Sequence, residues 1–277
     1  MRESAVLFGS HGGLVGILTQ PEVVRADFAV LISNVGMHHR VGPFRVNVDL
    51  ARALAAAGVA TLRFDRSGVG DSVPRTTPGN DHDHAMRDTS EAMDWLTGRL
   101  GITRFVLVAL CSGVDVAHET TVQDPRVVGA VFIDGYAYPT AGFRWRRTVP
   151  RLLDLERIRR FVRRRWHRAQ HPAFFATPSS DRGAAIFTRQ NPTAAQYRND
   201  VRAMAARGTR VLMVYTGAMG VHLNAPHQLY EIVGRDVDRA RVGVAWFPDA
   251  DHLFSTTPAR AALIERLVAW SGAIGAS

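Results

Sequence analysis

Two chemically reactive side chains, Cys111 and His252, lie far apart along the chain. Cys111 directly follows residues 105–110, an apolar run of strand length without polar alternation, which is typical of a strand buried on both faces of a sheet. A helical pattern begins right after it. A thiol at a helix N-terminus meets the positive end of the helix dipole, and a neighbouring imidazolium is expected to lower its pKa further. The alternative is that Cys111 is a small buried hydrophobe and Ser112 an ordinary N-cap.

The five residues Ala109-Leu110-Cys111-Ser112-Gly113 resemble the nucleophile elbow of the α/β-hydrolase superfamily, Gly-x-nucleophile-x-Gly on a strand-turn-helix. A thiol replaces the usual serine, as in the dienelactone-hydrolase branch, and Ala109 replaces the first glycine. The resemblance implies an α/β-hydrolase fold and a catalytic triad in the chain order nucleophile, acid, histidine.

Within that resemblance, His252 occupies the place of the catalytic histidine, in the loop between the last predicted strand and the closing helix. The usual position of the acid, after the strand predicted at residues 210–215, holds no carboxylate. Asp134, at the end of the preceding strand, is the expected acid, because some members of the superfamily take the acid from there. Asn224 and Asp249 stay open as alternatives for orienting the imidazole.

The resemblance also implies an oxyanion hole made of backbone N–H groups. The expected donors are Ser112, which follows the nucleophile, and Gly36 with its neighbours Val35 and Met37, which follow the strand predicted at residues 28–33. Such donors stabilise the negative charge that develops on an attacked carbonyl oxygen.

The rest of the chain alternates strand and helix patterns, which predicts an α/β fold with a mostly parallel, doubly wound sheet of about eight strands. Ser-His-Gly-Gly between two short apolar runs predicts an opening hairpin. Residues 65–72 are a glycine-rich Asp-x-x-Gly-x-Gly-x-Ser turn that resembles one found in many α/β hydrolases. No Gly-Lys-Ser/Thr follows it, so a phosphate-binding P-loop is not expected. Strands are predicted at residues 5–9, 14–19, 28–33, 59–64, 105–110, 127–133, 210–215 and 242–247, and helices at 46–57, 84–99, 192–206 and 258–270.

The alternation stops between residues 139 and 192, and this position in the chain resembles that of a helical cap or lid. The predicted domains are therefore a core of residues 1–138 and 193–277 and a cap of residues 139–192. Residues 144–168 hold eleven arginines, on a basic amphipathic helix predicted to start at Pro150. Three roles stay open for it: a solvated outer face, a docking surface for an acidic carrier protein or CoA phosphates, and contact with a membrane surface or nucleic acid. No nucleic-acid motif accompanies the charge, so a nucleic-acid partner is not expected.

Composition limits the class of protein. The 277 residues are 46% hydrophobic and 21% charged, which is ordinary for a soluble globular chain. The formal charge of +9 comes from arginine alone, because the sequence has no lysine. A single cysteine excludes an internal disulfide and fits a reducing compartment. No membrane span or signal peptide is recognisable, so a cytoplasmic location is expected, and no cofactor or metal motif is found.

The resemblance, with Cys111 and His252 at the nucleophile and histidine positions, implies a hydrolase or acyltransferase that acts on an ester or thioester carbonyl. A thiolate exchanges readily with thioesters, which favours an acyl thioesterase whose small-molecule substrate is linked to CoA or a carrier protein. The alternative is an α/β-hydrolase fold that has lost hydrolysis and serves as an isomerase, a cyclase or a ligand-binding protein. The departures at Ala109 and Cys111, and the missing acid after the strand at residues 210–215, are what keep this alternative open.

Overall fold

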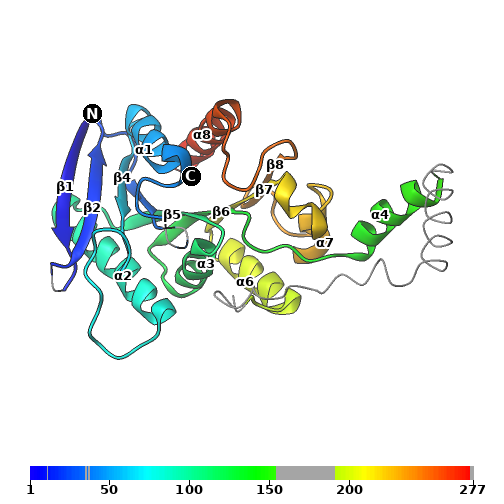
Figure 1. Ribbon diagram of the computed structural model, residues 1–277, viewed down its shortest axis with the longest axis horizontal. Helices are drawn as coiled ribbons and strands as arrows, with labels where there is room; N and C mark the ends of the chain where they lie inside the picture. The colour runs from blue at the N-terminus through cyan, green and yellow to red at the C-terminus, as the bar shows by residue number, and fades with distance from the viewer. Residues whose placement is uncertain (11, 35, 37, 154–190, 275–277) are drawn as a thin grey trace, which may run out of the picture.

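The computed structural model describes the chain except for residues 11, 35, 37, 154–190 and 275–277. An eight-stranded sheet forms the centre of this described part, in the order β1-β2-β4-β3-β5-β6-β7-β8 (Figure 1). β1 pairs with β2 and β2 pairs with β4 in antiparallel fashion, and every other pair is parallel. The predicted α/β fold with a mostly parallel sheet is confirmed. The strands are β1 (Arg2–Phe8), β2 (Leu14–Gln20), β3 (Phe28–Ile32), β4 (Ala60–Phe64), β5 (Arg104–Leu110), β6 (Val127–Ile133), β7 (Arg210–Thr216) and β8 (Val242–Phe247).

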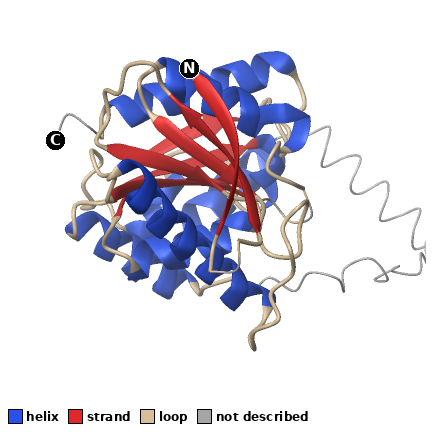
Figure 2. Ribbon diagram, turned by 90° about the vertical axis from the view of Figure 1, so that its left-hand side faces the viewer, coloured by secondary structure: helices blue, strands red, loops and turns tan. Residues whose placement is uncertain are grey.

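Helices cover both faces of the sheet (Figure 2). α1 and α8 contact each other on one face, while α2, α3 and α6 lie side by side on the other (Figure 1). The short helix α7 packs against α6, and α4 contacts α7. The helices are α1 (Val46–Ala56), α2 (Asp81–Leu100), α3 (Gly113–Gln123), α4 (Ala141–Leu153), α6 (Ala194–Ala206), α7 (Gln228–Val233) and α8 (Thr257–Gly272), with short 3₁₀ turns η1 (Pro43–Arg45) and η3 (Gly217–Val221).

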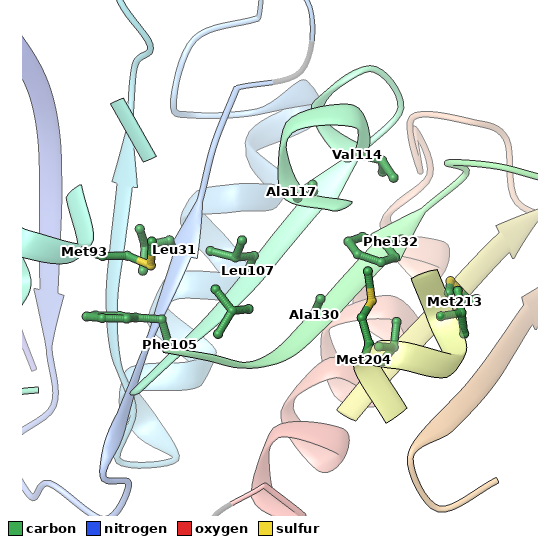
Figure 3. Close-up of a cluster of buried hydrophobic side chains, with 14 of the residues drawn as sticks. Leu31, Met93, Phe105, Leu107, Val114, Ala117, Ala130, Phe132, Met204 and Met213 are labelled. Carbon is green, nitrogen blue, oxygen red and sulfur yellow. The ribbon is translucent and has the colours of Figure 1, made fainter. Parts of the chain in front are cut away.

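The apolar run of β5, which predicted a strand buried on both faces, contributes alternate side chains to two hydrophobic cores. Phe105 and Leu107 of β5 face the cluster under α2, α3 and α6, where Met93, Ala117 and Phe132 meet them (Figure 3). The alternate β5 residues, Val106, Val108 and Leu110, face the cluster under α1 and α8. Successive side chains of a strand point to opposite faces, so an unbroken apolar sequence is needed to bury both.

Two helices begin earlier than the sequence predicted. α2 begins at Asp81, earlier than predicted, because the side chains of Asn80 and Asp83 form a capping box that satisfies exposed backbone donors. α4 begins at Ala141 and runs past position 150, so the prediction that Pro150 starts a helix is wrong. The remainder of the predicted basic helix, beyond Leu153, lies outside the described residues, as does most of the predicted cap. Among the described helices, none is long and apolar enough to cross a membrane.

We expect Leu62→Ala to lower the free energy of unfolding by about 2–5 kcal/mol, because truncating a fully buried leucine removes apolar contacts and leaves a cavity. Leu62 lies in β4 and is 0% exposed. Urea unfolding monitored by circular dichroism measures the change. Leu7→Ala is the matched control, since Leu7 is 68% exposed and a surface truncation changes stability by about 0.5 kcal/mol or less. Equal losses in the two variants would contradict the assigned core.

The parallel part of the sheet determines where reactive groups gather. β3, β5, β6, β7 and β8 run in the same direction, so their carboxyl ends share one edge of the sheet. In open α/β sheets ligands bind outside this edge. Asn34, Cys111, Asp134 and Thr216 each end a strand there or follow one closely.

Candidate active site

Cys111 lies on a tight turn between β5 and α3. Its φ is 55°, in the left-handed region that non-glycine residues rarely adopt. Such strain persists only where the surrounding structure imposes it, and it is common at functional sites. A Cβ on Gly113 would lie 2.8 Å from the backbone oxygen of Asn34, so the turn requires glycine there.

Asp134 follows β6 and is also left-handed, with a φ of 47°. Its side chain is 0% exposed. The backbone N–H of Thr216 donates to Oδ1 at 2.8 Å, and the Thr216 hydroxyl donates to Oδ2 at 2.6 Å. Oδ2 also lies 2.8 Å from Nδ1 of His252. The carboxylate is therefore held by β7 while it faces the imidazole.

The loop after β8 brings His252 to the sheet edge. Gly217 makes this approach possible, because a Cβ there would lie 2.2 Å from the backbone oxygen of Pro248, and its N–H donates to the backbone oxygen of Ala250 at 3.1 Å. Asp251 turns away from the ring and accepts hydrogen bonds from Ser255. The loop is thereby bonded to the end of β7 through Gly217 and stabilised internally by the hydrogen bonds between Ser255 and Asp251.

His252 joins the two other groups. Its hydrogen bond with Asp134, and next its hydrogen bond with Cys111, raise the pKa of His252 to about 10 against the opposing effect of burial. Because Nδ1 faces the carboxylate, Nε2 is the nitrogen left for the sulfur. The structure therefore brings together the predicted nucleophile, histidine and first-choice acid.

The other two acid candidates lie elsewhere. Asn224 accepts a hydrogen bond from Arg146 Nε at 2.9 Å and donates to the backbone oxygen of Phe143 at 3.1 Å, which joins α4 to the segment after η3. Asp249 is exposed in the loop after β8. In the described residues Asp134 alone among the three candidates meets His252.

The predicted oxyanion loop approaches the elbow from β3. The Gly36 N–H donates to Oγ of Ser112 at 3.1 Å. Val35 and Met37 lie outside the described residues, so the oxyanion role of this loop stays a prediction.

A buried polar network holds the start of this loop. Nδ2 of Asn34 donates to Asp65 at 2.9 Å, and Oδ1 of Asn34 accepts from the backbone N–H of Arg66. Arg40 forms an ion pair with the same Asp65, whose side chain is 0% exposed. The sequence placed Asp65 in a glycine-rich turn but did not predict that it anchors the loop from β3. Within the described part of the chain, no group of three or more acidic, histidine or cysteine side chains is arranged to hold a metal ion.

The sequence profile of the alpha/beta hydrolase family matches residues 10–263. The chain belongs to the alpha/beta hydrolase family. No curated protein matched the sequence.

Solved structures share the fold of this α/β hydrolase at low identity. The esterase domain of a Rhodothermus marinus protein is 17% identical, with 98% of each chain covered and a TM-score of 0.58. The α/β hydrolase GrgF of Penicillium sp. sh18 is 15% identical, with 100% of each chain covered and a TM-score of 0.60. An α/β serine hydrolase homologue from Coxiella burnetii is 15% identical, with 97% of this chain and 96% of the other covered and a TM-score of 0.54.

In this α/β hydrolase, the fall of activity at high pH should follow the deprotonation of His252. We expect kcat/KM to stay high at neutral pH and to fall as pH rises towards about 10, because the His252 imidazolium, which can donate a proton, is lost there. Acylation of the sulfur removes one of the two hydrogen bonds that raise this pKa. The pKa governing kcat, which reports the acyl-enzyme, should therefore be lower than the one governing kcat/KM. Steady-state pH profiles and an NMR titration of His252 measure both; a value near 6.5 in the free protein would contradict the assigned network.

Proposed function

We propose that this protein hydrolyses an ester or thioester through a covalent acyl-enzyme on Cys111. The observation that carries the proposal is that His252 is hydrogen-bonded by Asp134 on one side and by Cys111 on the other. A thiol needs an adjacent base or cation to act as a nucleophile at neutral pH, and an oriented imidazole supplies both. The description of the Rhodothermus marinus relative in fold as an esterase domain agrees with an acyl substrate.

The proposed reaction has two steps. In the first, the Cys111 thiolate attacks the carbonyl carbon, and backbone N–H groups of Ser112 and the Gly36 loop hold the oxyanion. The carbon–oxygen or carbon–sulfur bond then breaks, and the His252 imidazolium protonates the departing alcohol or thiol. In the second step, neutral His252 removes a proton from water, which attacks the thioester and releases the carboxylic acid. Asp134 keeps the imidazole in the required orientation throughout.

The choice between ester and thioester depends on features other than the triad. A thiolate reacts with either carbonyl, and transfer to an acceptor other than water would use the same acyl-enzyme. The arginines that suggested CoA or a carrier protein lie mainly in residues 154–168, outside the described residues. The described site therefore supports acyl chemistry on Cys111 without favouring a carrier.

Mass spectrometry of the intact protein tests the proposal. The protein is incubated with p-nitrophenyl esters and N-acetylcysteamine thioesters of two to eight carbons and quenched in acid. We expect a mass increase equal to one acyl group, mapped to the peptide that contains Cys111, the only cysteine of the chain. His252→Gln should slow both the appearance and the loss of this adduct. A protein that releases acid from these substrates without any adduct on Cys111, or that neither binds nor cleaves them, would contradict the proposal and favour the non-hydrolytic alternative.

A further inference from the structure

A cavity of about 750 Å³ opens beside the elbow. Gly36 and Ser112 line it on the side of the nucleophile. The other lining side chains on which the inference depends are polar or charged and come from the turn after β4 and from α2, α3 and α6: Arg66, His82, Asp115, His118, Glu119 and Asp200. A ligand next to the reacting carbonyl would therefore meet these hydrogen-bonding groups beside the apolar surface of Val116 and Val122.

Arg66 has unused hydrogen-bonding capacity in this cavity. One terminal nitrogen, Nη2, donates to the backbone oxygen of Gly36 at 3.2 Å. Its Nε is buried and meets no acceptor among the described residues. No described carboxylate lies within ion-pair distance of the guanidinium, although buried arginines are normally paired. The buried Nε does not open onto the cavity, so a ligand oxygen would bind the guanidinium through its terminal nitrogens.

His118 is the second group with an unused atom. The residue is 5% exposed and its ring packs against Tyr136 and Tyr197. Nε2 lies 2.9 Å from Asp200 Oδ2, but the buried Nδ1 has no partner within the described part of the chain. Buried polar atoms are rarely left unsatisfied, and those that are call for an explanation such as a ligand or water.

The carboxylates of the cavity are each already engaged by a protein group. Asp115 accepts a hydrogen bond from the Tyr136 hydroxyl at 2.7 Å. Glu119 lies 2.6 Å from Nε2 of His82. A carboxylate accepts up to about four hydrogen bonds, so Glu119 and Asp200 can also accept from donors on a ligand. The cavity thus offers acceptors on α3 and α6 and at least one donor on Arg66.

Charge and polarity select among ligand classes. A phosphate or carboxylate would be repelled by Asp115, Glu119 and Asp200 at close range. A cation would be repelled by Arg66. An apolar acyl chain would remove water from charged groups without replacing their hydrogen bonds, which is costly. Neutral hydroxyl groups both donate and accept, so they satisfy the carboxylates and Arg66 together.

We propose that this cavity binds a neutral polyhydroxyl group, a sugar or polyol, as the alcohol portion of the ester that Cys111 cleaves. This inference rests on the proposed function, because it names the substrate class of the same site. The alcohol oxygen would lie beside the elbow, where His252 protonates it on departure, and the remaining hydroxyls would contact Arg66 and the carboxylates of α3 and α6.

A kinetic comparison tests the inference. The substrates are 6-O-acetyl esters of methyl glucoside, galactoside and mannoside, and cyclohexylmethyl acetate, which keeps the ring but has no hydroxyls. We expect kcat/KM for at least one glycoside ester to exceed that of the cyclohexyl ester by about tenfold or more, since each lost hydrogen bond to a charged group costs roughly that factor. The ratio should fall by about tenfold in Arg66→Met and also fall in His118→Phe, which keeps a ring but removes both nitrogens. Glu265→Gln, on the exposed side of α8, is the matched control and should keep the wild-type ratio.

Binding measurements separate this inference from the proposed function. Saturation-transfer NMR with Cys111→Ala uses the three methyl glycosides, cyclohexylmethanol and adenosine 3′,5′-bisphosphate as probes. Glycoside binding that competes with the ester supports the inference. Glycoside binding without turnover of any ester would contradict the hydrolase proposal, and with it the assignment of the sugar as the alcohol portion of an ester. Equal turnover of the glycoside and cyclohexyl esters overturns the inference and leaves the hydrolase proposal intact. Preferential binding of the bisphosphate would also overturn it, in favour of a CoA-like ligand.

Discussion

Replacing Cys111 with alanine is expected to lower kcat/KM for acyl esters at least about ten-thousand-fold, because the variant keeps the cavity and the proposed oxyanion donors but has no atom that can accept the acyl group. Cys111 ends β5 in a left-handed conformation, within a chain of hydrogen bonds that continues to His252 and Asp134. Initial rates with a chromogenic ester measure the loss, and circular dichroism checks that the variant is folded.

Cys111→Ser is the informative companion variant. A serine hydroxyl fits the same turn, but it keeps its proton near neutral pH, so it cannot form the thiolate–imidazolium pair that raises the pKa of His252. We expect the serine variant to retain about a hundredth or less of the wild-type rate, and the titration of His252 to move to lower pH in both variants. An alanine variant with activity within tenfold of the wild type would remove Cys111 from the mechanism, whatever the fold.

The second large effect is expected from Asp134→Asn, which should lower kcat by about ten-thousand-fold, as loss of the orienting acid does in other acyl-transfer triads. The asparagine oxygen would still accept the hydrogen bond from Thr216, so the site would stay folded. Its amide nitrogen, however, would face Nδ1 of His252 and force the ring proton to the opposite nitrogen. In that tautomer the imidazole cannot take a proton through the nitrogen nearest the sulfur.

The same change should lower the pKa of His252, because the hydrogen bond with Asp134 is the largest contribution to its rise. An NMR titration of the imidazole in the wild type and in Asp134→Asn measures this shift directly. Asp249→Asn is the matched control: this carboxylate is exposed in the same loop, and its loss should change kcat by less than about twofold. Loss of activity in Asp249→Asn, with Asp134→Asn fully active, would show that Asp134 is not the catalytic acid.

The sequence predicted most accurately the features that depend on a single strand. The bounds of β6 and β8 agree with the predicted ranges, because an unbroken run of β-branched and aromatic residues between turn residues leaves few alternatives. Asp134 directly follows β6 and His252 lies in the loop after β8, so both could be chosen from their places in the α/β-hydrolase pattern, and parallel strands deliver their carboxyl ends to one edge.

Contacts between side chains on elements far apart in the sequence could not be predicted. Thr216 shares Asp134 with His252 only because β6 and β7 are neighbours in the sheet, a pairing that no local pattern specifies. The contact of Asn34 with Asp65 likewise joins β3 to the turn after β4. The start of α4 was misplaced because proline is common at the first position of a helix, and nothing in the local sequence shows that this helix begins nine residues earlier, at Ala141.

The proposed nucleophile, Cys111, is the only cysteine in the sequence, so the proposed activity depends on the redox state of its surroundings. A thiolate paired with an imidazolium reacts with peroxides to give a sulfenic acid, and further oxidation is irreversible. Many redox-sensitive enzymes protect this intermediate with a neighbouring thiol that forms an internal disulfide. The present chain contains no such partner, so recovery of oxidised Cys111 would depend on glutathione or another external reductant reaching the sheet edge.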